Sequence, residues 1–370
     1  MKKIRILYTI NYITNGGPSR VLLNIVNNLD KNKYDISILT IIDKNDKKIV
    51  SDLKKEGINI IEFKLKKSLK SLFKNYRNIQ KKIINISPDI IHTHGIVTTT
   101  IVGSSKINAY KITTIHNNIY EDYSYTYGKL KGKIFANIHL HVLKKFDQVV
   151  CCSKTSYEII KHKFKNIDYI RNGIECNYDF KNEVVRKQIR KDLKIPIENI
   201  VYIYVGQLNK RKRVIELVNL FNKSLKENEN LIIVGTGPFI DDIKKIACNK
   251  IKIVGFKNNV YDYFCAADIY TSNSSSEGFS ISIIEALSSG LLLLLSDIPS
   301  HIECFEIDHN YYLGEFYDTN DFDGKKNLLI SKFNRKEKES VYEFQKKYLS
   351  SFIMTLEYEK YYKEGIGDKK

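Results

Sequence analysis

The 370-residue sequence predicts an α/β fold built from two Rossmann-like, parallel-sheet domains. Short apolar runs alternate with helix-like patterns along the whole chain, which is typical of α/β proteins. Several of these runs are apolar over most of their length, as expected for parallel strands that helices cover on both faces. The length also suits two domains of ordinary size. We therefore expect two parallel sheets that face each other across a cleft, with the ligand site in that cleft.

In the first half, candidate strands lie at residues 4–10, 36–41, 59–63, 90–92, 111–115 and 148–152. Helical patterns separate these runs, and the clearest covers residues 65–83, where apolar residues recur every three or four positions. Residues 170–180 have no periodicity, which indicates a crossing between domains. We assign an N-terminal domain to residues 1–172.

In the second half, candidate strands lie at residues 200–205, 231–234, 252–254, 269–271 and 291–295, and candidate helices at 214–226, 239–248, 260–266 and 280–288. This repeated alternation predicts a second domain over residues 180–335. The last stretch, about residues 340–363, is an aromatic-rich helical pattern that no strand follows. We expect it to pack back onto the N-terminal domain.

The composition is that of a globular protein, with 43% apolar and 28% charged residues and a net charge of +18. The charge is uneven. Residues 1–180 hold 31 basic and 15 acidic residues, whereas residues 181–370 hold 29 and 27. A bias in the coding sequence would act on both halves, so the first half is expected to face an anionic partner. A membrane surface, a nucleic acid and a phosphorylated acceptor all fit that description.

The cysteines and the apolar runs indicate a cytoplasmic protein. The six cysteines form no C-x-x-C pair and are typical of reduced thiols. The N-terminal segment is interpreted as a first strand, since Arg5 and Asn11 interrupt its apolar run. The apolar run at residues 291–295 is far shorter than the roughly 18 residues that a membrane span requires. We expect a protein that is not integral to a membrane but can lie on its surface.

The strongest local feature is a Ser-rich loop that carries Glu277 and leads into a helix carrying Glu285. The backbone N–H groups of Gly278, Phe279 and Ser280 lie where that helix begins, which makes them a candidate anion site. The two carboxylates could accept hydrogen bonds from the vicinal hydroxyls of a sugar. On the residues alone, ordinary exposed or capping roles for both carboxylates remain equally open.

Two further loops follow predicted strands. Residues 210–213 are four consecutive cations, among them Arg211 and Lys212, and could neutralise a diphosphate. A solvated basic turn is the commoner fate of such a run. In the first loop, Gly16 and Gly17 precede a proline at the expected start of a helix, and this tight turn suits a phosphate. It lacks the G-x-G-x-x-G pattern, so a dinucleotide site is disfavoured.

Histidines gather at predicted strand ends, with His92 and His94 after one strand and His116 after another. No pair has zinc-ligand spacing together with a third ligand, so we expect no metal site. A lone strand-end histidine is more often structural than catalytic. The expected position of His116 at the cleft makes it the candidate among them.

Taken together, these segments resemble glycosyltransferase family 4, the retaining enzymes of the GT-B fold, over nearly the whole chain. The matching segments are Gly-Gly-Pro-Ser-Arg (16–20), Pro-Asp-Ile-Ile-His-Thr-His-Gly (88–95), Thr-Ile-His-Asn (114–117), Asp-Gln-Val-Val-Cys-Cys-Ser (147–153), Arg-Asn-Gly-Ile-Glu (171–175), Gly-Thr-Gly-Pro (235–238) and Ala-Asp (267–268). Glu277 and Glu285, separated by seven residues, match the family's signature. Each match alone is weak, but their order along the chain is specific.

The resemblance implies roles for these residues. Glu285 would bind the ribose hydroxyls of a nucleotide-sugar, while Glu277 and the 278–280 backbone would hold the transferred sugar and the phosphates. Lys212 matches a lysine that stabilises the diphosphate. Its usual arginine companion falls on Gln207, a departure that Arg211 could compensate. Gly17 would lie near the donor phosphates, and His116 beside the reacting sugar.

The implied function is hexosyl transfer with retention, from a UDP- or GDP-sugar to a glycan or polyprenyl-diphosphate-linked acceptor. Surface polysaccharide synthesis of the capsule or O-antigen type is the expected setting. The N-terminal domain would be the acceptor side, and the C-terminal domain would bind the donor. No metal and no cofactor are expected, since cations and backbone donors would stabilise the leaving diphosphate. The basic N-terminal domain would hold the enzyme on the anionic inner face of the cell membrane.

Two other classes remain as alternatives. A basic nucleic-acid-binding protein would explain the charge, but the sequence has no aromatic–basic core motif and no zinc finger, so we expect no nucleic acid. Another GT-B enzyme, such as a sugar epimerase or a phosphorylase, would share the architecture. A phosphorylase would require a lysine site for pyridoxal phosphate, and none is identified.

Overall fold

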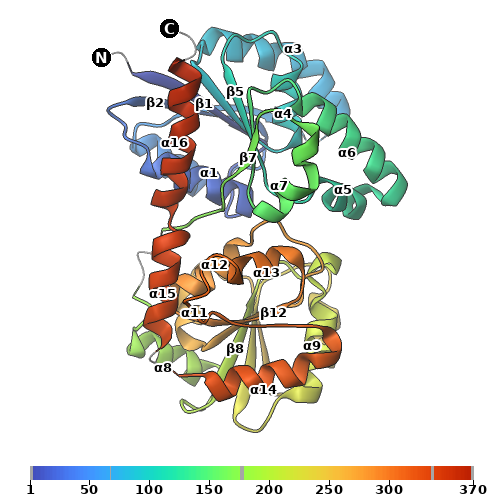
Figure 1. The fold of residues 1–370 in the computed structure, drawn as a ribbon, viewed down its shortest axis with the longest axis vertical. Coiled ribbons are helices and arrows are strands. Elements are labelled where there is room, and N and C mark those ends of the chain that lie inside the picture. Colours follow the sequence, from blue (N-terminus) through green and yellow to red (C-terminus); the bar gives the residue numbers. More distant parts are fainter. Residues whose placement is uncertain (1–2, 67, 176–178, 335–336, 368–370) are drawn as a thin grey trace. The chain divides into compact units, whose positions relative to one another are not determined.

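The computed structural model describes residues 3–66, 68–175, 179–334 and 337–367 (Figure 1). The chain divides into two compact units. The first contains the residues up to Gly173 and those from Ser351 onward, and the second is Ile174–Ser350. Each unit is built around one parallel sheet, so the predicted α/β class with two parallel sheets is confirmed.

The first unit has a seven-stranded sheet in the order β3-β2-β1-β4-β5-β6-β7. Its strands are β1 (Ile4–Ile10), β2 (Tyr34–Ile42), β3 (Asn59–Leu65), β4 (Ile90–His94), β5 (Tyr110–Ile115), β6 (Gln148–Cys151) and β7 (Ile167–Tyr169). Its helices are α1 (Gly17–Asn28), α2 (Lys47–Lys55), α3 (Leu69–Ile86), α4 (Ile96–Gly103), α5 (Ile119–Tyr127), α6 (Lys129–Leu143), α7 (Lys154–Ile160) and α16 (Ser351–Gly367).

The second unit has a six-stranded sheet in the order β10-β9-β8-β11-β12-β13. Its strands are β8 (Ile200–Val205), β9 (Glu229–Val234), β10 (Ile251–Gly255), β11 (Ile269–Ser272), β12 (Leu292–Ser296) and β13 (Gly314–Tyr317). Its helices are α8 (Glu183–Asp192), α9 (Val214–Ser224), α10 (Ile240–Ile246), α11 (Tyr261–Ala266), α12 (Ile281–Ser288), α13 (Pro299–Phe305), α14 (Phe322–Lys332) and α15 (Glu337–Tyr348), with a short 3₁₀ turn, η2 (Lys210–Lys212), before α9.

In both sheets the strand order reverses beside the first strand of the unit. β1 pairs with β2 on one side and β4 on the other, and β8 pairs in the same way with β9 and β11. The carboxyl ends of the strands at such a reversal are the usual ligand position in open α/β sheets. The loops that follow β8 and β11 are therefore the expected position of a ligand site in the second unit.

Several elements have no clear signal in the sequence, because of their length or the residues that they bury. β7 and β13 have only three and four residues, too few for a pattern to stand out. α8 was missed because the residues that it buries are Arg186 and Arg190 instead of an apolar stripe. Apolar periodicity reveals a helix when its buried face is apolar, whereas the buried face of α8 carries two arginines.

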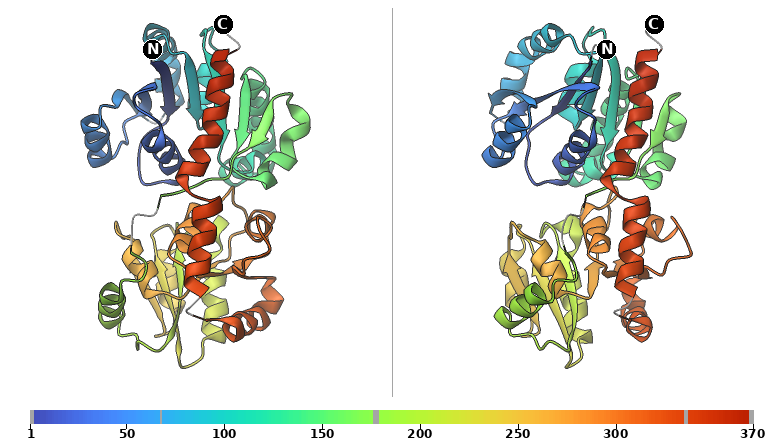
Figure 2. Two further views of the ribbon diagram at one scale, coloured as in Figure 1. Left: turned by 60° about the vertical axis from the view of Figure 1, so that its left-hand side comes forward. Right: turned by 90° about the vertical axis from the view of Figure 1, so that its left-hand side faces the viewer.

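The C-terminal stretch, which the sequence predicts as one helical pattern, consists of two helices. Residue 350 interrupts it by forming a parallel bridge with Ile174, and α15 and α16 belong to different units. Figure 2 shows α16, in red, running beside the strands of the first sheet. Tyr362 of α16 shares a hydrogen bond of 2.9 Å with Tyr8 of β1, and Tyr358 shares one of 2.9 Å with Thr114 of β5.

The basic stretch at residues 64–82 is only partly helical. α3 begins at Leu69, after Ser68, whose side chain accepts from the N–H of Ser71 and caps the helix. Lys64 precedes it in a left-handed conformation, with φ of 49°, near the end of β3. Lys67 lies outside the described residues. α3 itself therefore carries five of the eight cations of this stretch, and it has no acidic residue.

Candidate functional site

The candidate site of the second unit begins with the basic turn η2, which follows β8. Asn209 shapes this turn by accepting a hydrogen bond of 3.1 Å from the N–H of Lys212 through its side-chain oxygen. The turn is then fixed to the loop after β11, because Ser275 donates to the carbonyl of Arg211 through both its N–H and its hydroxyl, each at 2.9 Å. Two loops that are more than sixty residues apart are thus held together at the carboxyl ends of neighbouring strands.

Glu277 is the centre of this arrangement. Its carboxylate accepts a hydrogen bond of 2.8 Å from the Arg211 guanidinium, and it is also paired with the Lys212 ammonium. The Ser274 hydroxyl donates a third bond of 2.7 Å to the oxygen that Lys212 contacts. Arg211 additionally donates to the carbonyl of Ser276 at 2.5 Å. The sequence predicted a carboxylate loop and a basic turn, and the structure brings them into direct contact.

This cluster carries a net positive charge at neutral pH. Burial alone would raise the pKa of Glu277, but the charges of Lys212 and Arg211 outweigh burial and lower that pKa to about 2. Glu277 is therefore ionised and offsets only one of its two cationic neighbours. The side chains of Lys212 and Glu277 are only 11% and 7% exposed, so solvent screens the pair weakly. A partly buried site with one uncompensated positive charge favours an anionic ligand.

Helix α12 begins four residues after Glu277. Gly278 and Phe279 are buried and Ser280 is half-buried, and α12 follows at Ile281. A helix N-terminus presents backbone N–H groups and a partial positive charge. The local field of α12 therefore adds to that of the two cations.

Glu285 is buried within α12, with 2% of its surface exposed. Its charge and that of Glu277 both act on Tyr270 of β11. Burial, together with Tyr204 and these two carboxylates, raises the pKa of the Tyr270 hydroxyl well above its ordinary value. The two glutamates of the signature thus act electrostatically on the same buried tyrosine.

A pair of glycines allows the loop after β9 to pack against the loop after β8. A Cβ on Gly235 would meet the carbonyl oxygen of Gly206 at 1.9 Å, and one on Gly237 would meet the carbonyl oxygen of Leu208 at 2.4 Å. Only glycine allows the two backbones to approach this closely. The Gly-Thr-Gly-Pro turn therefore supports the loop that carries Arg211 and Lys212.

Not all the predicted residues of this unit join the cluster. Gln207 is exposed, and its side-chain oxygen accepts a hydrogen bond of 3.1 Å from Asn209 within the same loop. Its backbone carbonyl accepts a bond of 2.8 Å from the Tyr204 hydroxyl. Arg211 instead supplies the guanidinium beside Glu277.

Two residues around Glu277 escaped the sequence analysis. Ser274 looked like one member of a Ser-rich loop, although its hydroxyl contacts Glu277 directly. His301, on α13, is fully buried, and its ring nitrogen Nδ1 lies 2.9 Å from the carbonyl oxygen of Ser296. Burial lowers the pKa of His301 to about 4, even though the charge of Glu277 raises it. The only sequence signal for His301 was its place five residues after the end of a strand.

The first unit holds the other two candidates, Gly17 and His116. Gly17 is the first residue of α1, with Gly16 before it and Pro18 in the first turn, as predicted. His116 directly follows β5 and is half-buried. Its Nε2 atom lies 3.0 Å from Nδ1 of His94, and the two rings stack with their centroids 5.2 Å apart.

Burial keeps these histidines neutral. Burial lowers the pKa of His116 to about 4 and holds the pKa of His94 well below its ordinary value. His92 continues the network, with one ring nitrogen 2.7 Å from the Tyr362 hydroxyl and the other 2.7 Å from the Thr114 hydroxyl. The rings of His92 and His94 have centroids 4.3 Å apart, so the strand-end histidines form one connected, uncharged cluster that ends at His116.

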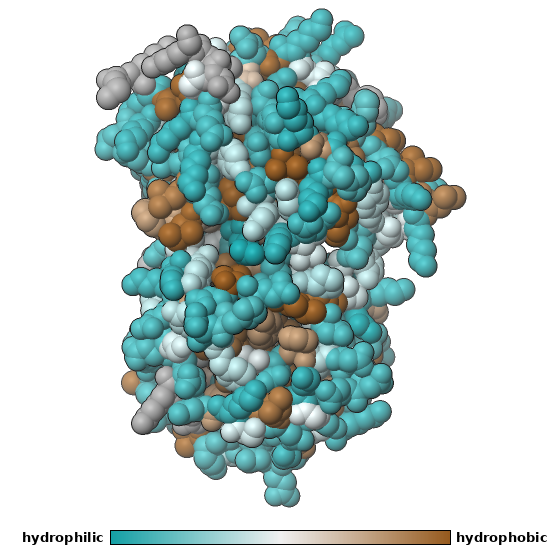
Figure 3. Space-filling view, in the orientation of Figure 1, coloured by the Kyte–Doolittle hydropathy of each residue, from teal (hydrophilic) through white to brown (hydrophobic). Residues whose placement is uncertain are grey.

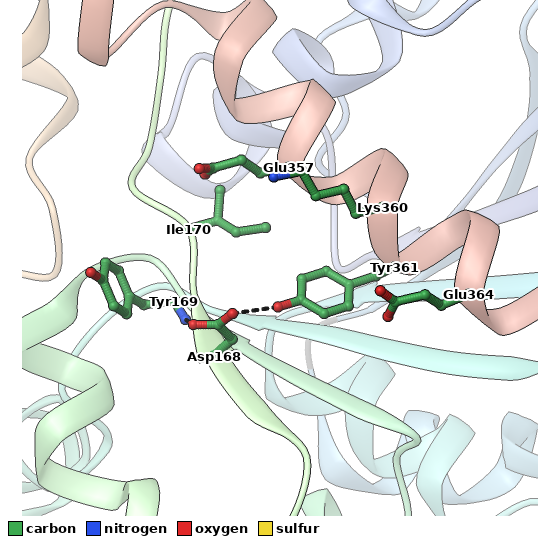
Figure 4. A pocket seen from close by; sticks show the side chains of 7 residues that line it. All are labelled: Asp168, Tyr169, Ile170, Glu357, Lys360, Tyr361 and Glu364. Carbon is green, nitrogen blue, oxygen red and sulfur yellow. Dashed lines mark hydrogen bonds between the residues drawn. The ribbon is translucent and has the colours of Figure 1, made fainter.

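The first unit also contains a cavity of about 140 Å³ between β7 and α16 (Figure 4). Residues from both elements line it: Asp168, Tyr169, Ile170, Glu357, Lys360, Tyr361 and Glu364. The Tyr361 hydroxyl donates a hydrogen bond of 2.5 Å to Asp168 across it. None of the candidate site residues contributes to this cavity.

Among the described residues, no helix is both long and apolar enough to cross a membrane. Within the same residues, no three or more His, Cys, Asp or Glu side chains are grouped so that they could hold a metal ion.

Two family models match this chain. Residues 185–363 match the glycosyl transferases group 1 model, and residues 15–178 match the glycosyltransferase family 4 model. Together they cover both units, including every candidate site residue.

Individual proteins agree with these matches. An O-antigen biosynthesis glycosyltransferase of Escherichia coli, WclY, is 28% identical over 318 residues, which are 82% of this chain and 83% of that protein. HepE of Anabaena, solved with UDP and glucose, has a TM-score of 0.76 at 14% identity and covers 97% of this chain and 99% of its own. Sucrose-phosphate synthase of Thermosynechococcus elongatus has a TM-score of 0.79 at 15% identity, covering 99% and 100%. The chain therefore belongs to glycosyltransferase family 4 and has the GT-B fold of that family.

Proposed function

We propose that this glycosyltransferase transfers a hexose, with retention of anomeric configuration, from a UDP- or GDP-sugar to a glycan or polyprenyl-diphosphate-linked acceptor. The setting we propose is the synthesis of an O-antigen or capsule type of surface polysaccharide. One observation carries the donor assignment. Lys212 and Arg211 converge on Glu277 at the carboxyl ends of β8 and β11, beside the N-terminus of α12.

The relatives support the donor class and the setting. HepE is named in complexes with UDP and with UDP-glucose, which supports a nucleotide-sugar donor and favours uridine as the first base to test. WclY is named for O-antigen biosynthesis, and another relative, TuaC of Bacillus subtilis, for teichuronic acid biosynthesis. Both names refer to bacterial polysaccharides, which supports a glycan acceptor.

The diphosphate would bind to Lys212 and Arg211. As the bond between the sugar and the diphosphate breaks, negative charge accumulates on the leaving phosphate oxygens, and preorganised cations stabilise that charge most. The diphosphate would compete with Glu277 for both cations, because the carboxylate pairs with each of them. Once displaced, Glu277 would be free to accept hydrogen bonds from hydroxyls of the transferred sugar.

The other candidates would complete the donor site. Glu285 would accept bonds from the two ribose hydroxyls, and the backbone N–H groups of residues 278–280 would contact the phosphates. Gly17 would allow close approach of the α1 N-terminus to the donor, and neutral His116 would contact the reacting sugar. We assign no general base to the protein.

We propose that this chemistry requires no metal ion, because the two cations and the α12 N-terminus already supply positive charge to the diphosphate. The reaction would occur on the cytoplasmic side of the cell membrane, where the five described cysteines, all free thiols, would stay reduced.

The decisive experiment is a transfer assay with a panel of radiolabelled UDP- and GDP-hexoses and polyprenyl-diphosphate-linked acceptors, with and without EDTA. We expect transfer from one donor class, an α-linkage by NMR when the donor is an α-linked nucleotide-sugar, and activity that survives EDTA. An inverted linkage would contradict the retaining mechanism. Loss of activity in EDTA that Mg²⁺ restores would contradict the metal-free mechanism.

A further inference from the structure

Helices α5 and α6 of the first unit form a hairpin with an apolar stripe on its outer surface. Leu130, Ile134 and Ile138 follow one another at intervals of four along α6 and are 78%, 54% and 55% exposed. Side chains at this spacing share one face of a helix. Tyr127 at the end of α5 and Phe135 on α6 extend the patch, at 51% and 42% exposed. We call these five residues the hairpin stripe.

The hairpin stripe is not the face that holds α6 to the domain. The residues that α6 buries are Gly132, Ala136, His139, Leu140 and Leu143. By the 100° turn per residue of an α-helix, this set is centred on the opposite side from Ile134. α6 is therefore apolar on its inner face, which packs in the core, and again on its outer face. Figure 3 shows hydrophobic surface at the edge of the molecule where Figure 1 places α5 and α6.

The close packing of the hairpin keeps the stripe outward. A Cβ on Gly132 would lie 2.7 Å from backbone atoms of Ser124, so α6 crosses α5 almost backbone to backbone. A Cβ on Gly103 of α4 would meet the side chain of Val142 at 2.6 Å, which fixes the other end of α6. Rotation of α6 to bury the stripe would break both contacts.

The charges around the hairpin stripe indicate the class of partner that it fits. Lys129, Lys131 and Lys133 are exposed in the first turns of α6, and Lys144 and Lys145 are exposed just beyond its end. Residues 129–146 contain no acidic residue. The acidic residues of α5, Glu121 and Asp122, lie in its first turn, at the far end from Tyr127. An apolar row bordered by cations matches the interface of an anionic bilayer, where the row enters the acyl boundary and lysines meet the headgroups.

We propose that the hairpin stripe docks the enzyme on an anionic phospholipid bilayer by partial insertion. The basic helix α3 is the competing docking surface, because its five cations would also attract an anionic membrane. Among the described side chains of α3, however, Ile84 is the one large apolar residue that is exposed, at 53%. α3 can attract anionic lipid at long range, but α6 also offers a contiguous apolar surface, which monomeric proteins seldom expose without a function.

The absence of tryptophan from the chain makes a direct test possible. Ile134→Trp would place a single fluorophore in the stripe, Ile84→Trp one on α3, and Val184→Trp one on the exposed surface of α8, where Val184 is 78% exposed. With vesicles that contain phosphatidylglycerol, we expect a blue shift of emission and quenching by acyl-brominated lipid for Ile134→Trp only. Quenching at Ile84 without quenching at Ile134 would assign docking to α3 and overturn the proposal.

Partition measurements give a second test. The variant Leu130→Ser/Ile134→Ser/Ile138→Ser should bind these vesicles on the order of 100-fold more weakly, since three partly exposed apolar side chains are lost. The control Val184→Ser/Ile197→Ser/Ile246→Ser removes exposed apolar residues outside the hairpin and should bind like the parent. Thermal midpoints of both variants check the fold.

Three results would overturn the proposal: unchanged binding by the stripe variant, equal partition of the parent into phosphatidylcholine vesicles, or a blue shift at Ile134 that depends on protein concentration without lipid. The last result would make the stripe a protein–protein interface. No donor or acceptor is present in these measurements, so their failure would leave the proposed donor site unaffected.

Discussion

Lys212 and Lys210 occupy the same short turn but have very different surroundings. Lys212 is paired with Glu277 and mostly buried, whereas Lys210 is exposed. The difference arises because Asn209 holds the N–H of Lys212 and so directs the end of the turn toward the loop after β11. Two lysines separated by one residue in the sequence therefore become one site residue and one surface residue.

We expect Lys212→Ala to lower kcat/KM by about 100- to 1,000-fold, since it removes a positive charge that would stabilise the negative charge developing on the diphosphate. Lys210→Ala is the matched control and should stay within about twofold. Steady-state kinetics with the donor identified by the panel assay measure both. Equal losses in the two variants would mean that the turn contributes only general positive charge.

A second expectation concerns Glu285. Glu285→Gln should weaken binding of the nucleotide-sugar by roughly 10- to 150-fold, the cost of about 1.5–3 kcal/mol for losing a charged hydrogen-bond acceptor. Isothermal titration calorimetry measures this, and Glu198→Gln, a change at an exposed position, is the control. Unchanged affinity in Glu285→Gln would place the ribose elsewhere.

At the scale of the element, α8 is attached to the second unit by charge. Asp268, just before β11, accepts hydrogen bonds of 2.8 Å from both Arg186 and Arg190 of α8. Arg190 also donates to the carbonyls of Ala266, at 2.9 Å, and Asn199, at 2.8 Å. The side chains in this cluster are at most 5% exposed, so its hydrogen bonds are nearly free of competition from water.

We expect Arg190→Met to destabilise the second unit by about 3–5 kcal/mol, because it leaves buried carbonyls and part of the Asp268 charge without a partner. Lys187→Met, on the exposed face of α8, should change stability by less than about 0.5 kcal/mol. Urea unfolding followed by circular dichroism would compare the two. Similar midpoints for both variants would show that α8 is held by other contacts.

At the scale of the whole molecule, buried histidines make stability depend on pH in the mildly acidic range. His116 and His139 in the first unit and His301 in the second each have a pKa lowered to about 4 by burial. The unfolded chain binds these protons near pH 6.5, so it takes up more protons than the folded chain between about pH 6.5 and 4. Stability must therefore fall as pH decreases through this window. Glu277 affects stability at lower pH than the histidines do. The stabilisation from its charge is fully present above about pH 4.5 and is lost only as pH falls toward 2.

His139 offers a clean test, since neither of its ring nitrogens has a hydrogen-bond partner among the described residues. His139→Leu removes one titrating group without touching the candidate site. We expect its melting temperature to exceed that of the parent by a margin that widens as pH falls from 6.5 to 4. Differential scanning calorimetry at half-unit pH steps measures the margin, and a constant margin would contradict a neutral buried His139.

The sequence by itself determined the two parallel sheets and most of their strands, because continuous apolar runs have few other folded outcomes. It also placed Glu277 and the basic turn in loops that follow strands, where a parallel sheet gathers its loops, and Glu285 in the helix after one of them. Only the tertiary structure decided which of these residues meet. Arg211, and not Gln207, pairs with Glu277, the Ser274 hydroxyl donates to the same carboxylate, and His301 acts on it electrostatically. Contacts between loops more than sixty residues apart depend on strand order, and no local pattern encodes strand order. The structure likewise decided that α6 keeps an apolar face outward, since periodicity shows that a helix has an apolar face but not what covers it.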